Sequence, residues 1–250
     1  MSLISALRKR AVERSPEPLL RSVRRLRARA IETWTGKAIW PRWAMLRTVE
    51  PLSGVWGNDR GLAVHRYYLN AFLERSKNDV RGRVLEFQDD QYATRLGGDA
   101  VTRLDILHVD DTNERATIVA DLTTDNDIPS NTFDCIICTH VLHLIFDVER
   151  AVSELHRILK PGGTLLLAVP QTSMYAPYYH ELWRFTPPGL KRVLATSFPV
   201  QDIRVEAYGN SLVTAGELRG LVVEEFSKKE LDAIDERFAL ELCVRLVKRP

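Results

Sequence analysis

Short apolar runs alternate with amphipathic segments through the second half of the chain. Residues 133–138 form a run of β-branched and small apolar residues, which is typical of a strand buried on both faces. Apolar residues then recur every three or four positions from Val148 to Leu159, as on one face of a helix. Residues 160–163 (KPGG) end that helix, and residues 164–169 form a second buried strand. Two strands joined by a helix predict a right-handed parallel crossover.

The same patterns predict further elements on both sides of this crossover. Strands are expected at residues 83–87, 101–107, 116–120, 203–207 and 240–247. Helices are expected within residues 64–73, 93–96, 189–197 and 212–226. Counted from residue 83, the chain therefore has seven strands with helices or helical turns between them, which indicates an α/β fold.

Length and composition fit a globular protein with one main domain and an appendage. The chain has 250 residues, and 45% of them are hydrophobic. No stretch approaches the ~18 consecutive apolar residues of a membrane span. The first ten residues place their basic cluster after a very short apolar stretch, the reverse of a secretory signal. We therefore expect a cytoplasmic protein.

Charge divides the chain into two parts. Residues 1–50 hold twelve Lys or Arg against four Asp or Glu, whereas the remaining 200 residues hold 23 basic and 29 acidic residues. The predicted organisation is a basic helical N-terminal arm, residues 1–53, followed by one domain, residues 54–250. A basic, partly amphipathic arm fits an anionic surface such as the inner membrane, a polyanion or a protein partner. The alternative is a solvated helix that caps the domain.

The cysteines offer one candidate for metal or redox chemistry. Cys135 and Cys138 form a C-x-x-C, a spacing found in zinc sites and redox motifs. Both lie inside a predicted buried strand, and no second cysteine pair lies nearby. We interpret them as small core residues and expect no metal site.

Several sequence motifs resemble those of one enzyme family. The run R-x-L-K-P-G-G at residues 157–163 is similar to the helix end that precedes the fifth strand in class I S-adenosylmethionine-dependent methyltransferases. The run W-R-F-T-P-x-G at 183–189, with WG at 56–57, RYY at 66–68 and EAYGN at 206–210, resembles type 11 methyltransferase-like proteins encoded among bacterial glycan-assembly enzymes. The resemblance covers about residues 54–250. It implies a doubly wound, Rossmann-like, mostly parallel seven-stranded sheet whose last strand is antiparallel and lies between strands five and six.

The resemblance also implies S-adenosylmethionine as cofactor, at a loop that has changed. The family carries E/D-x-G-x-G-x-G after its first strand, and residues 86–92 here read EFQDDQY, so Glu86 remains and all three glycines are replaced. If such a loop binds the cofactor through Phe87, Gln88 and Tyr92, we expect its backbone to avoid positive φ and Gly97-Gly98 to make the tight turn. The alternative is a catalytically silent fold.

Acidic residues near later strand ends complete the predicted cofactor site. Asp105 follows Glu86 by 19 residues, the spacing at which nucleotide-binding sheets place a carboxylate for ribose hydroxyls, and Asp110 is the fallback. The resemblance implies an adenine contact at Asp121 and Leu122. Ile106 and Thr139 are the remaining candidates. The alternatives are that Asp105 is a surface residue beside Arg103 and that Asp121 caps a turn.

Histidines and aromatic residues are the candidates for catalysis and acceptor binding. His140 ends the predicted fourth strand, and an imidazole is suited to general-base catalysis near neutral pH. His143 and His180 are further candidates, and each could instead satisfy a loop carbonyl. Aromatic rings stack on sugars, and an arginine binds carboxylate or phosphate, so the predicted acceptor residues are Tyr178, Tyr179, Trp183 and Arg184. The alternative is that this segment is only pinned to the domain.

Three functions are consistent with these features. The first is S-adenosylmethionine-dependent O-methylation of a sugar or related glycan intermediate. The second is a silent methyltransferase fold that acts as a partner or scaffold in glycan assembly. The third, a nucleic-acid methyltransferase, is disfavoured because residues 51–250 are net acidic and because residues 139–142 read THVL where base-modifying relatives carry N-P-P-Y.

Overall fold

The computed structural model describes residues 48–250, which divide into two compact units. The larger unit comprises residues 65–214 and 233–250, and the smaller unit comprises residues 48–64 and 215–232. Within residues 48–250, no helix is long and apolar enough to cross a bilayer. Most of the predicted basic arm, residues 1–47, lies outside the described residues, so its role stays a prediction.

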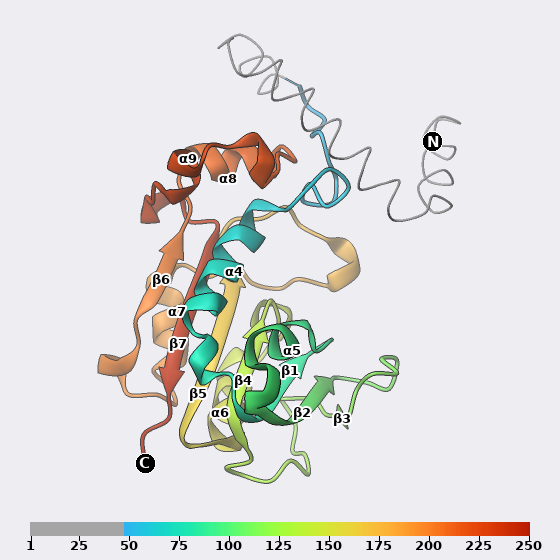
Figure 1. Cartoon of the computed structure of the whole chain (residues 1–250), viewed down its shortest axis with the longest axis vertical. Coiled ribbons are helices and arrows are strands. Elements are labelled where there is room, and N and C mark those ends of the chain that lie inside the picture. Colours follow the sequence, from blue (N-terminus) through green and yellow to red (C-terminus); the bar gives the residue numbers. More distant parts are fainter. Residues whose placement is uncertain (1–47) are drawn as a thin grey trace. The chain divides into compact units, whose positions relative to one another are not determined.

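A seven-stranded sheet forms the larger unit. Its strands are β1 (Gly82–Phe87), β2 (Val101–His108), β3 (Ile118–Val119), β4 (Phe133–Thr139), β5 (Leu159–Pro170), β6 (Val205–Tyr208) and β7 (Glu241–Val247). They lie in the order β3-β2-β1-β4-β5-β7-β6, and β7 is antiparallel to both neighbours (Figure 1). The predicted fold class is confirmed, including the seventh strand between the fifth and sixth. The third strand is shorter than predicted, with only two residues in the ladder.

The described residues contain six α-helices. They are α4 (Val64–Arg75), α5 (Gln91–Gly97), α6 (Val148–Ile158), α7 (Pro187–Leu194), α8 (Ser211–Leu218) and α9 (Lys228–Asp232). The helix predicted for residues 212–226 is wrong in length, because α8 ends at Leu218. Gly220 follows with φ of 79°, a left-handed conformation that commonly ends a helix.

Two hydrophobic clusters cover the two faces of the sheet. In β5, Leu165, Leu167 and Val169 face the cluster that contains the buried side of α6 and α7. Leu166 and Ala168 face the opposite cluster, which contains residues of α4 and α5. Successive residues of one strand point to opposite faces, so a strand covered on both sides must be apolar throughout. This explains why β4 and β5 appear in the sequence as continuous apolar runs.

The R-x-L-K-P-G-G motif joins the end of α6 to the sheet. Arg157 pairs with the buried Glu154 at 2.5 Å, and Lys160 pairs with Asp134 at 2.7 Å. A Cβ on Gly163 would lie 2.9 Å from the Lys160 carbonyl oxygen, so this close approach requires glycine. The motif therefore has a structural role, which is to guide the chain from α6 into β5.

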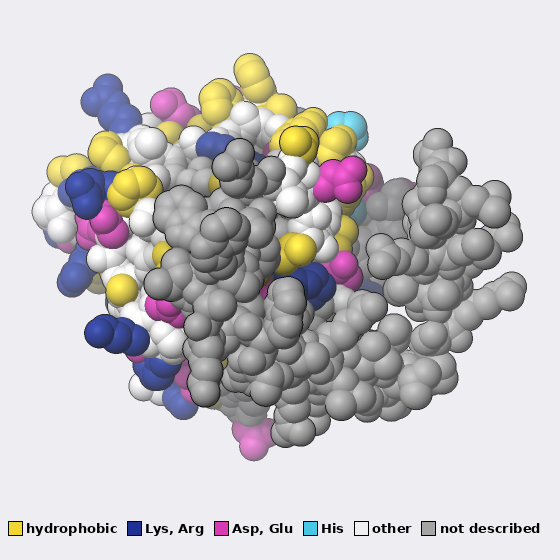
Figure 2. Space-filling view, turned by 90° about the horizontal axis from the view of Figure 1, so that it is seen from above, with side chains coloured by type: hydrophobic (Ala, Val, Ile, Leu, Met, Phe, Trp, Pro, Cys, Tyr) yellow, Lys and Arg dark blue, Asp and Glu magenta, His cyan; other side chains and the backbone are white. Residues whose placement is uncertain are grey.

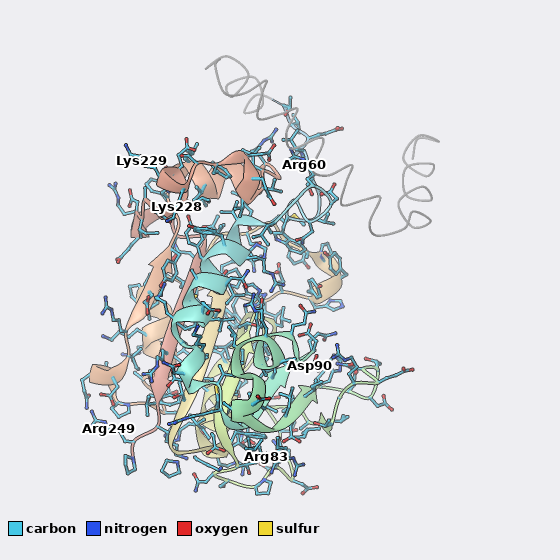
Figure 3. The ribbon with its side chains drawn as sticks, in the orientation of Figure 1. Arg60, Arg83, Asp90, Lys228, Lys229 and Arg249 are labelled. Carbon is cyan, nitrogen blue, oxygen red and sulfur yellow. The ribbon has the colours of Figure 1, made fainter. Side chains whose placement is uncertain are left out.

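Hydrogen bonds across its two segments hold the smaller unit together. Arg60 binds Glu225 through both carboxylate oxygens, at 2.5 and 3.0 Å, and donates to the Gly220 carbonyl oxygen at 2.5 Å (Figure 3). A β-bridge pairs Ala63 with Val222. The Leu52 amide also donates to the Arg219 carbonyl oxygen at 2.8 Å. Residues 48–64 are thus bound to residues 215–232, which follow them by more than 150 positions.

Candidate active site

The loop after β1 is held by a buried carboxylate. Glu86 is only 2% exposed, and its two oxygens accept hydrogen bonds from the backbone amides of Tyr92 and Ala93, at 3.1 and 2.7 Å. These amides belong to the first turn of α5, where backbone donors lack helical partners. Glu86 therefore holds the loop after β1 against the first turn of α5.

The same loop contains a residue with a left-handed backbone at a position where the family motif has glycine. Gln88, which aligns with the first glycine of the family motif, has φ of 70°, so the expectation that the loop avoids positive φ is wrong. Such a conformation costs a non-glycine residue ~1–3 kcal/mol and persists only where neighbours enforce it. Asn113 supplies one restraint, because its Nδ2 donates to the Gln88 carbonyl oxygen at 2.8 Å. Arg115 supplies another by pairing with Asp90.

The titration of Glu86 follows from its burial. Loss of solvent raises the pKa of Glu86 to about 7 from its ordinary value of 4.5, although the amides of Ala93 and Tyr92 oppose the rise. The folded protein thus binds a proton that the unfolded chain releases between pH 4.5 and about 7. The stability that the protonated Glu86 contributes is fully present below its pKa in the unfolded chain. It is lost as the pH rises through its pKa in the folded protein.

We expect the Glu86→Gln variant to have a flatter stability profile than the wild type. Between about pH 5 and about pH 8, the melting temperature of the wild type should fall by several degrees more than that of Glu86→Gln. The reason is that ionisation of Glu86 lowers the free energy of unfolding by roughly 3 kcal/mol over this range. Thermal unfolding at both pH values measures this difference. The control is Glu236→Gln, an exposed glutamate on a short helical turn, which should keep the wild-type slope. Equal slopes in all three proteins would contradict the assignment.

The prediction that Asp105 stands at the end of the second strand is wrong. β2 continues to His108, and Asp105 pairs in register with Leu85 in the middle of the sheet. Its buried carboxylate accepts from Arg83 Nε at 2.7 Å and from an Arg103 terminal nitrogen at 3.2 Å. In Figure 3, Arg83 lies toward the lower end of the sheet and Asp90 lies above it, toward the ends of the parallel strands. Asp105 is therefore a structural group between two arginines.

The fallback residue, Asp110, lies beyond the end of β2. Its side chain is 53% exposed, and one oxygen lies 3.0 Å from His108 Nδ1. The hydrogen bonds that it accepts from Thr112 lower the pKa of Asp110. A charged, accessible carboxylate at this edge is suited to binding ribose hydroxyls.

The remaining predicted cofactor residues divide into edge groups and core groups. Asp121 lies two residues after the end of β3, and its Oδ1 accepts from the Thr123 amide and hydroxyl, each at 2.7 Å, as the turn-capping alternative predicted. Thr139 is the last residue of β4. Phe87, Ile106 and Leu122, in contrast, pack into or against the hydrophobic core. Their side chains pack beneath the edge of the sheet where the parallel strands end, and they do not extend beyond that edge.

His140 occupies a constrained position just after β4. Its amide donates to the Ala168 carbonyl oxygen at 2.8 Å, and its φ is 55°. Its Nε2 lies 2.8 Å from Oε1 of Glu241, the first residue of β7. The His140 side chain is 22% exposed, whereas Glu241 is completely buried. His140 therefore keeps part of its ring open at the edge of the sheet while one ring nitrogen is bound.

Two further histidines surround His140. The His65 ring, at the start of α4, lies 5.4 Å from the His140 ring between centroids, and the His143 ring lies 6.2 Å away. His143 Nε2 is 3.5 Å from Oε1 of the buried Glu181. Burial lowers the pKa of His143 to about 4, with the adjacent His140 adding to the effect, so His143 is neutral at physiological pH. We call His65, His140 and His143 the histidine cluster.

The aromatic segment, which we define as residues 175–185, follows β5 and lies against the loop that follows β4. The amides of Leu182 and Trp183 donate to the His143 carbonyl oxygen, and Trp183 Nε1 donates to the Ile145 carbonyl oxygen at 2.8 Å. The segment nevertheless exposes several apolar side chains, which are Tyr175, Tyr178, Tyr179, Leu182 and Trp183. Figure 2 looks down on the end toward which the parallel strands run, and hydrophobic side chains gather along its upper margin beside a histidine.

Two predicted residues of this segment have different surroundings from those expected. Arg184 binds Glu181 at 2.6 Å and the carbonyl oxygens of Met174 and Trp183, so its guanidinium braces the segment and does not face an acceptor. His180 is exposed after a short helical turn and is not part of the histidine cluster. Phe185 is 7% exposed and anchors the end of the segment in the core.

Sequence reasoning missed Glu241, Glu181 and His65. Glu241 is separated from His140 by 101 positions, yet it was visible as the one acid in a mostly apolar strand. An antiparallel strand begins at the edge where its parallel neighbours end, so its first residue belongs to the ligand edge. His65 and Glu181 carried no comparable signal.

Within residues 48–250, no group of three or more His, Cys, Asp or Glu side chains is arranged to hold a metal ion. The interpretation of Cys135 and Cys138 as core residues is confirmed, since both are completely buried. Burial raises the pKa of Cys138 to about 12.

Comparison with known proteins identifies the type of domain. Residues 82–167, from β1 into β5, match the family model of the methyltransferase domain. The ubiquinone/menaquinone biosynthesis C-methyltransferase UbiE of Teredinibacter turnerae is 40% identical over 60 residues, which are 23% of this chain and 24% of the relative. The corresponding enzyme of an Enterobacter species is 49% identical over 39 residues, 16% of each chain. This chain thus spans about a quarter or less of the curated relatives that it matches.

Solved structures extend the similarity to most of the chain. The [4+2]-cyclase SpnF matches with a TM-score of 0.50 and 17% identity, over 81% of this chain and 88% of the cyclase. An S-adenosylmethionine-dependent methyltransferase from Archaeoglobus fulgidus has a TM-score of 0.48 and 15% identity, over 73% and 94% of the two chains. At 17% identity, the match to the cyclase establishes a shared fold and not a shared reaction. The chain therefore has the fold of class I S-adenosylmethionine-dependent methyltransferases, and its residues 82–167 match the methyltransferase domain family.

Proposed function

We propose that this protein transfers a methyl group from S-adenosylmethionine to a hydroxyl of a sugar or related glycan intermediate. The observation that carries the proposal is His140, a partly exposed imidazole at the carboxyl end of β4, in a sheet of the methyltransferase type. Ligands of doubly wound sheets bind beyond the carboxyl ends of the strands. A hydroxyl acceptor needs a base there, because an alcohol is a weak nucleophile until it loses its proton.

The residues at this edge fit the cofactor. Gln88 has the left-handed backbone that glycine adopts most easily, so the loop after β1 makes a tight turn without a glycine there. In this proposal, Asp110, exposed beyond β2, binds the ribose hydroxyls, and Asp121, two residues after β3, binds the adenine amine. When bound, the cofactor supplies an electrophilic methyl group on a sulfonium.

Within the histidine cluster, we propose His140 as the ring that takes the acceptor proton. His143 stays neutral because it is buried and lies beside His140, so it does not compete for the acceptor proton. In this proposal, His140 takes the hydroxyl proton while the surrounding residues orient the ring and exclude water.

Exposed rings of the aromatic segment would bind the acceptor. Tyr178 and Tyr179 are 60% and 54% exposed, and their ring centroids are 4.6 Å apart. Aromatic faces stack on sugar rings, while their hydroxyls bind sugar hydroxyls. The segment is joined to His143 by backbone hydrogen bonds, which ties the acceptor surface to the histidine cluster.

Transfer of labelled methyl from S-adenosylmethionine to a glycan pool tests this function. We expect label in an O-methyl ether and no transfer to the same glycans with blocked hydroxyls. The Tyr178→Ala variant should raise the acceptor KM about 3- to 10-fold with little change in kcat, since one stacking contact contributes ~0.5–1.5 kcal/mol. Phe238→Ala, an exposed aromatic on a separate helical turn, is the control. Label on nitrogen or carbon would refute O-methylation.

A catalytically silent scaffold is the second candidate. The observation that favours it is the link between the loops after β1 and β2, made by Asn113 to Gln88 and by Arg115 to Asp90. In this form the two loops would remain joined and would not accept a cofactor. A titration with S-adenosylhomocysteine separates the two functions.

A further inference from the structure

We propose that Glu241 is the positioning residue of His140, holding the imidazole as its Nε2–H tautomer so that Nδ1 receives the acceptor proton. The proposal rests on the proposed O-methylation. It adds a residue from the last strand of the fold, more than 100 positions from His140, to the residues that prepare the base.

The position of Glu241 follows from the topology of the sheet. β7 runs antiparallel to β5, and its first residue, Glu241, pairs in register with Pro170, the last residue of β5. The start of β7 thus lies at the edge where the parallel strands end. His140 reaches the same edge from β4, because Thr139 pairs with Ala168 of β5. The two side chains meet across β5.

Burial makes the contact directional. Glu241 is completely buried, and the distance from its Oε1 to His140 Nε2 is 2.8 Å. In this proposal Glu241 is an ionised carboxylate, which only accepts hydrogen bonds, so that Nε2 carries the hydrogen. In a neutral imidazole the other nitrogen, Nδ1, then holds the lone pair.

The second oxygen of Glu241 supports the same conclusion. Its Oε2 is buried without a hydrogen-bond partner among the described residues. A buried carboxylate that is incompletely solvated gains most from a nearby positive charge. Protonation of His140 at Nδ1 creates that charge at hydrogen-bond distance, so Glu241 stabilises the imidazolium that forms when the acceptor hydroxyl loses its proton.

Further contacts limit the orientation of the ring. The His65 ring meets His140 at an interplanar angle of 68°, and the His143 ring meets it at 90°, so both contacts are edge-to-face. The left-handed backbone of His140 directs its side chain differently from that of an ordinary strand residue. Rings from α4 and from the loop after β4, with the carboxylate from β7, therefore surround one imidazole.

The chemical step balances with no additional reactant. The hydroxyl proton moves to His140 Nδ1, an oxygen lone pair forms the bond to the methyl carbon, and the carbon–sulfur electron pair remains on sulfur as the thioether forms. His140 later releases the proton to water. Glu241 takes no proton and acts only through the ring it holds.

Nitrogen-15 NMR of the histidine rings tests the proposal without any cofactor. Wild-type His140, assigned by comparison with His140→Asn, should show Nε2–H as the dominant neutral tautomer. Glu241→Gln should lose this preference, because an amide can both donate and accept, and Glu241→Asp should restore part of it. The control is Glu206→Gln on β6, whose carboxylate binds Arg75. It should leave the His140 tautomer unchanged.

Kinetics of the same variants provide the second readout. Glu241→Gln should lower kcat about 10-fold or more while the acceptor KM and the affinity for S-adenosylhomocysteine change less than about twofold. A dominant Nδ1–H tautomer in the wild type would overturn the proposal even if no variant folds. An unchanged tautomer in folded Glu241→Gln would also overturn it. Absence of any methyl transfer with the expected tautomer present would refute the proposed function but not the pairing.

Discussion

The His140→Asn variant is expected to lose methyl transfer almost completely, with kcat reduced by about 10²- to 10⁴-fold, the usual contribution of a positioned general base. Asparagine is the informative replacement because it tolerates the left-handed backbone of this position better than alanine does. It removes the titratable ring without adding backbone strain. Affinity for S-adenosylhomocysteine should change less than about twofold, since the base acts on the acceptor.

Single-turnover kinetics and calorimetry on His140→Asn separate these two effects. His180→Asn is the matched comparison, because His180 also has a left-handed backbone but is exposed and lies outside the histidine cluster. We expect it to retain far more activity. Retained turnover in His140→Asn, or equal losses in both variants, would remove His140 from the reaction.

The second large effect is expected on stability and concerns Asp105. Asp105→Ala should lower the free energy of unfolding by ~1.5–3 kcal/mol, the range for hydrogen bonds to charged groups, because Arg83 and Arg103 lose their shared acceptor. The melting temperature should fall by several degrees. Affinity for S-adenosylhomocysteine should remain close to that of the wild type below the unfolding transition.

Asp110→Ala should show the opposite pattern. Its free energy of unfolding should stay close to that of the wild type, as for an exposed substitution, while affinity for S-adenosylhomocysteine falls. Asp111→Ala, the exposed neighbour, is the control for both measurements. A stable Asp105→Ala protein that no longer binds S-adenosylhomocysteine would contradict this account and would show that Asp105, and not Asp110, contacts the ribose.

The fold was predictable because both faces of its central strands are covered. A strand such as β5 must then be apolar at every position, and the helix between β4 and β5 shows its buried face through Ala151, Val152, Leu155 and Ile158. The strand that failed, β3, has only two ladder residues and therefore little pattern to recognise. Helix α8 was predicted too long because the turn at Gly220 interrupts an otherwise continuous helical pattern.

The site was predictable only where a residue directly follows a strand. His140 was found because it comes immediately after β4, which the apolar run marks clearly. Asp105 was misplaced because a count of residues from Glu86 does not give the register, which pairs Asp105 with Leu85 inside the sheet. Glu241 depends on an antiparallel pairing between distant segments, and Gln88 on a backbone angle that its side chain does not indicate. Register and backbone strain are tertiary properties, which local sequence does not encode.

The central claim is that a loop without glycines still binds the methyl donor. Calorimetric titration of the folded protein with S-adenosylhomocysteine tests it most directly, because binding does not depend on knowing the acceptor. The proposed function predicts saturable binding at a single site per chain, together with a rise in melting temperature. No heat of binding and no rise in melting temperature at millimolar ligand, with the protein folded, would contradict it and leave the silent scaffold.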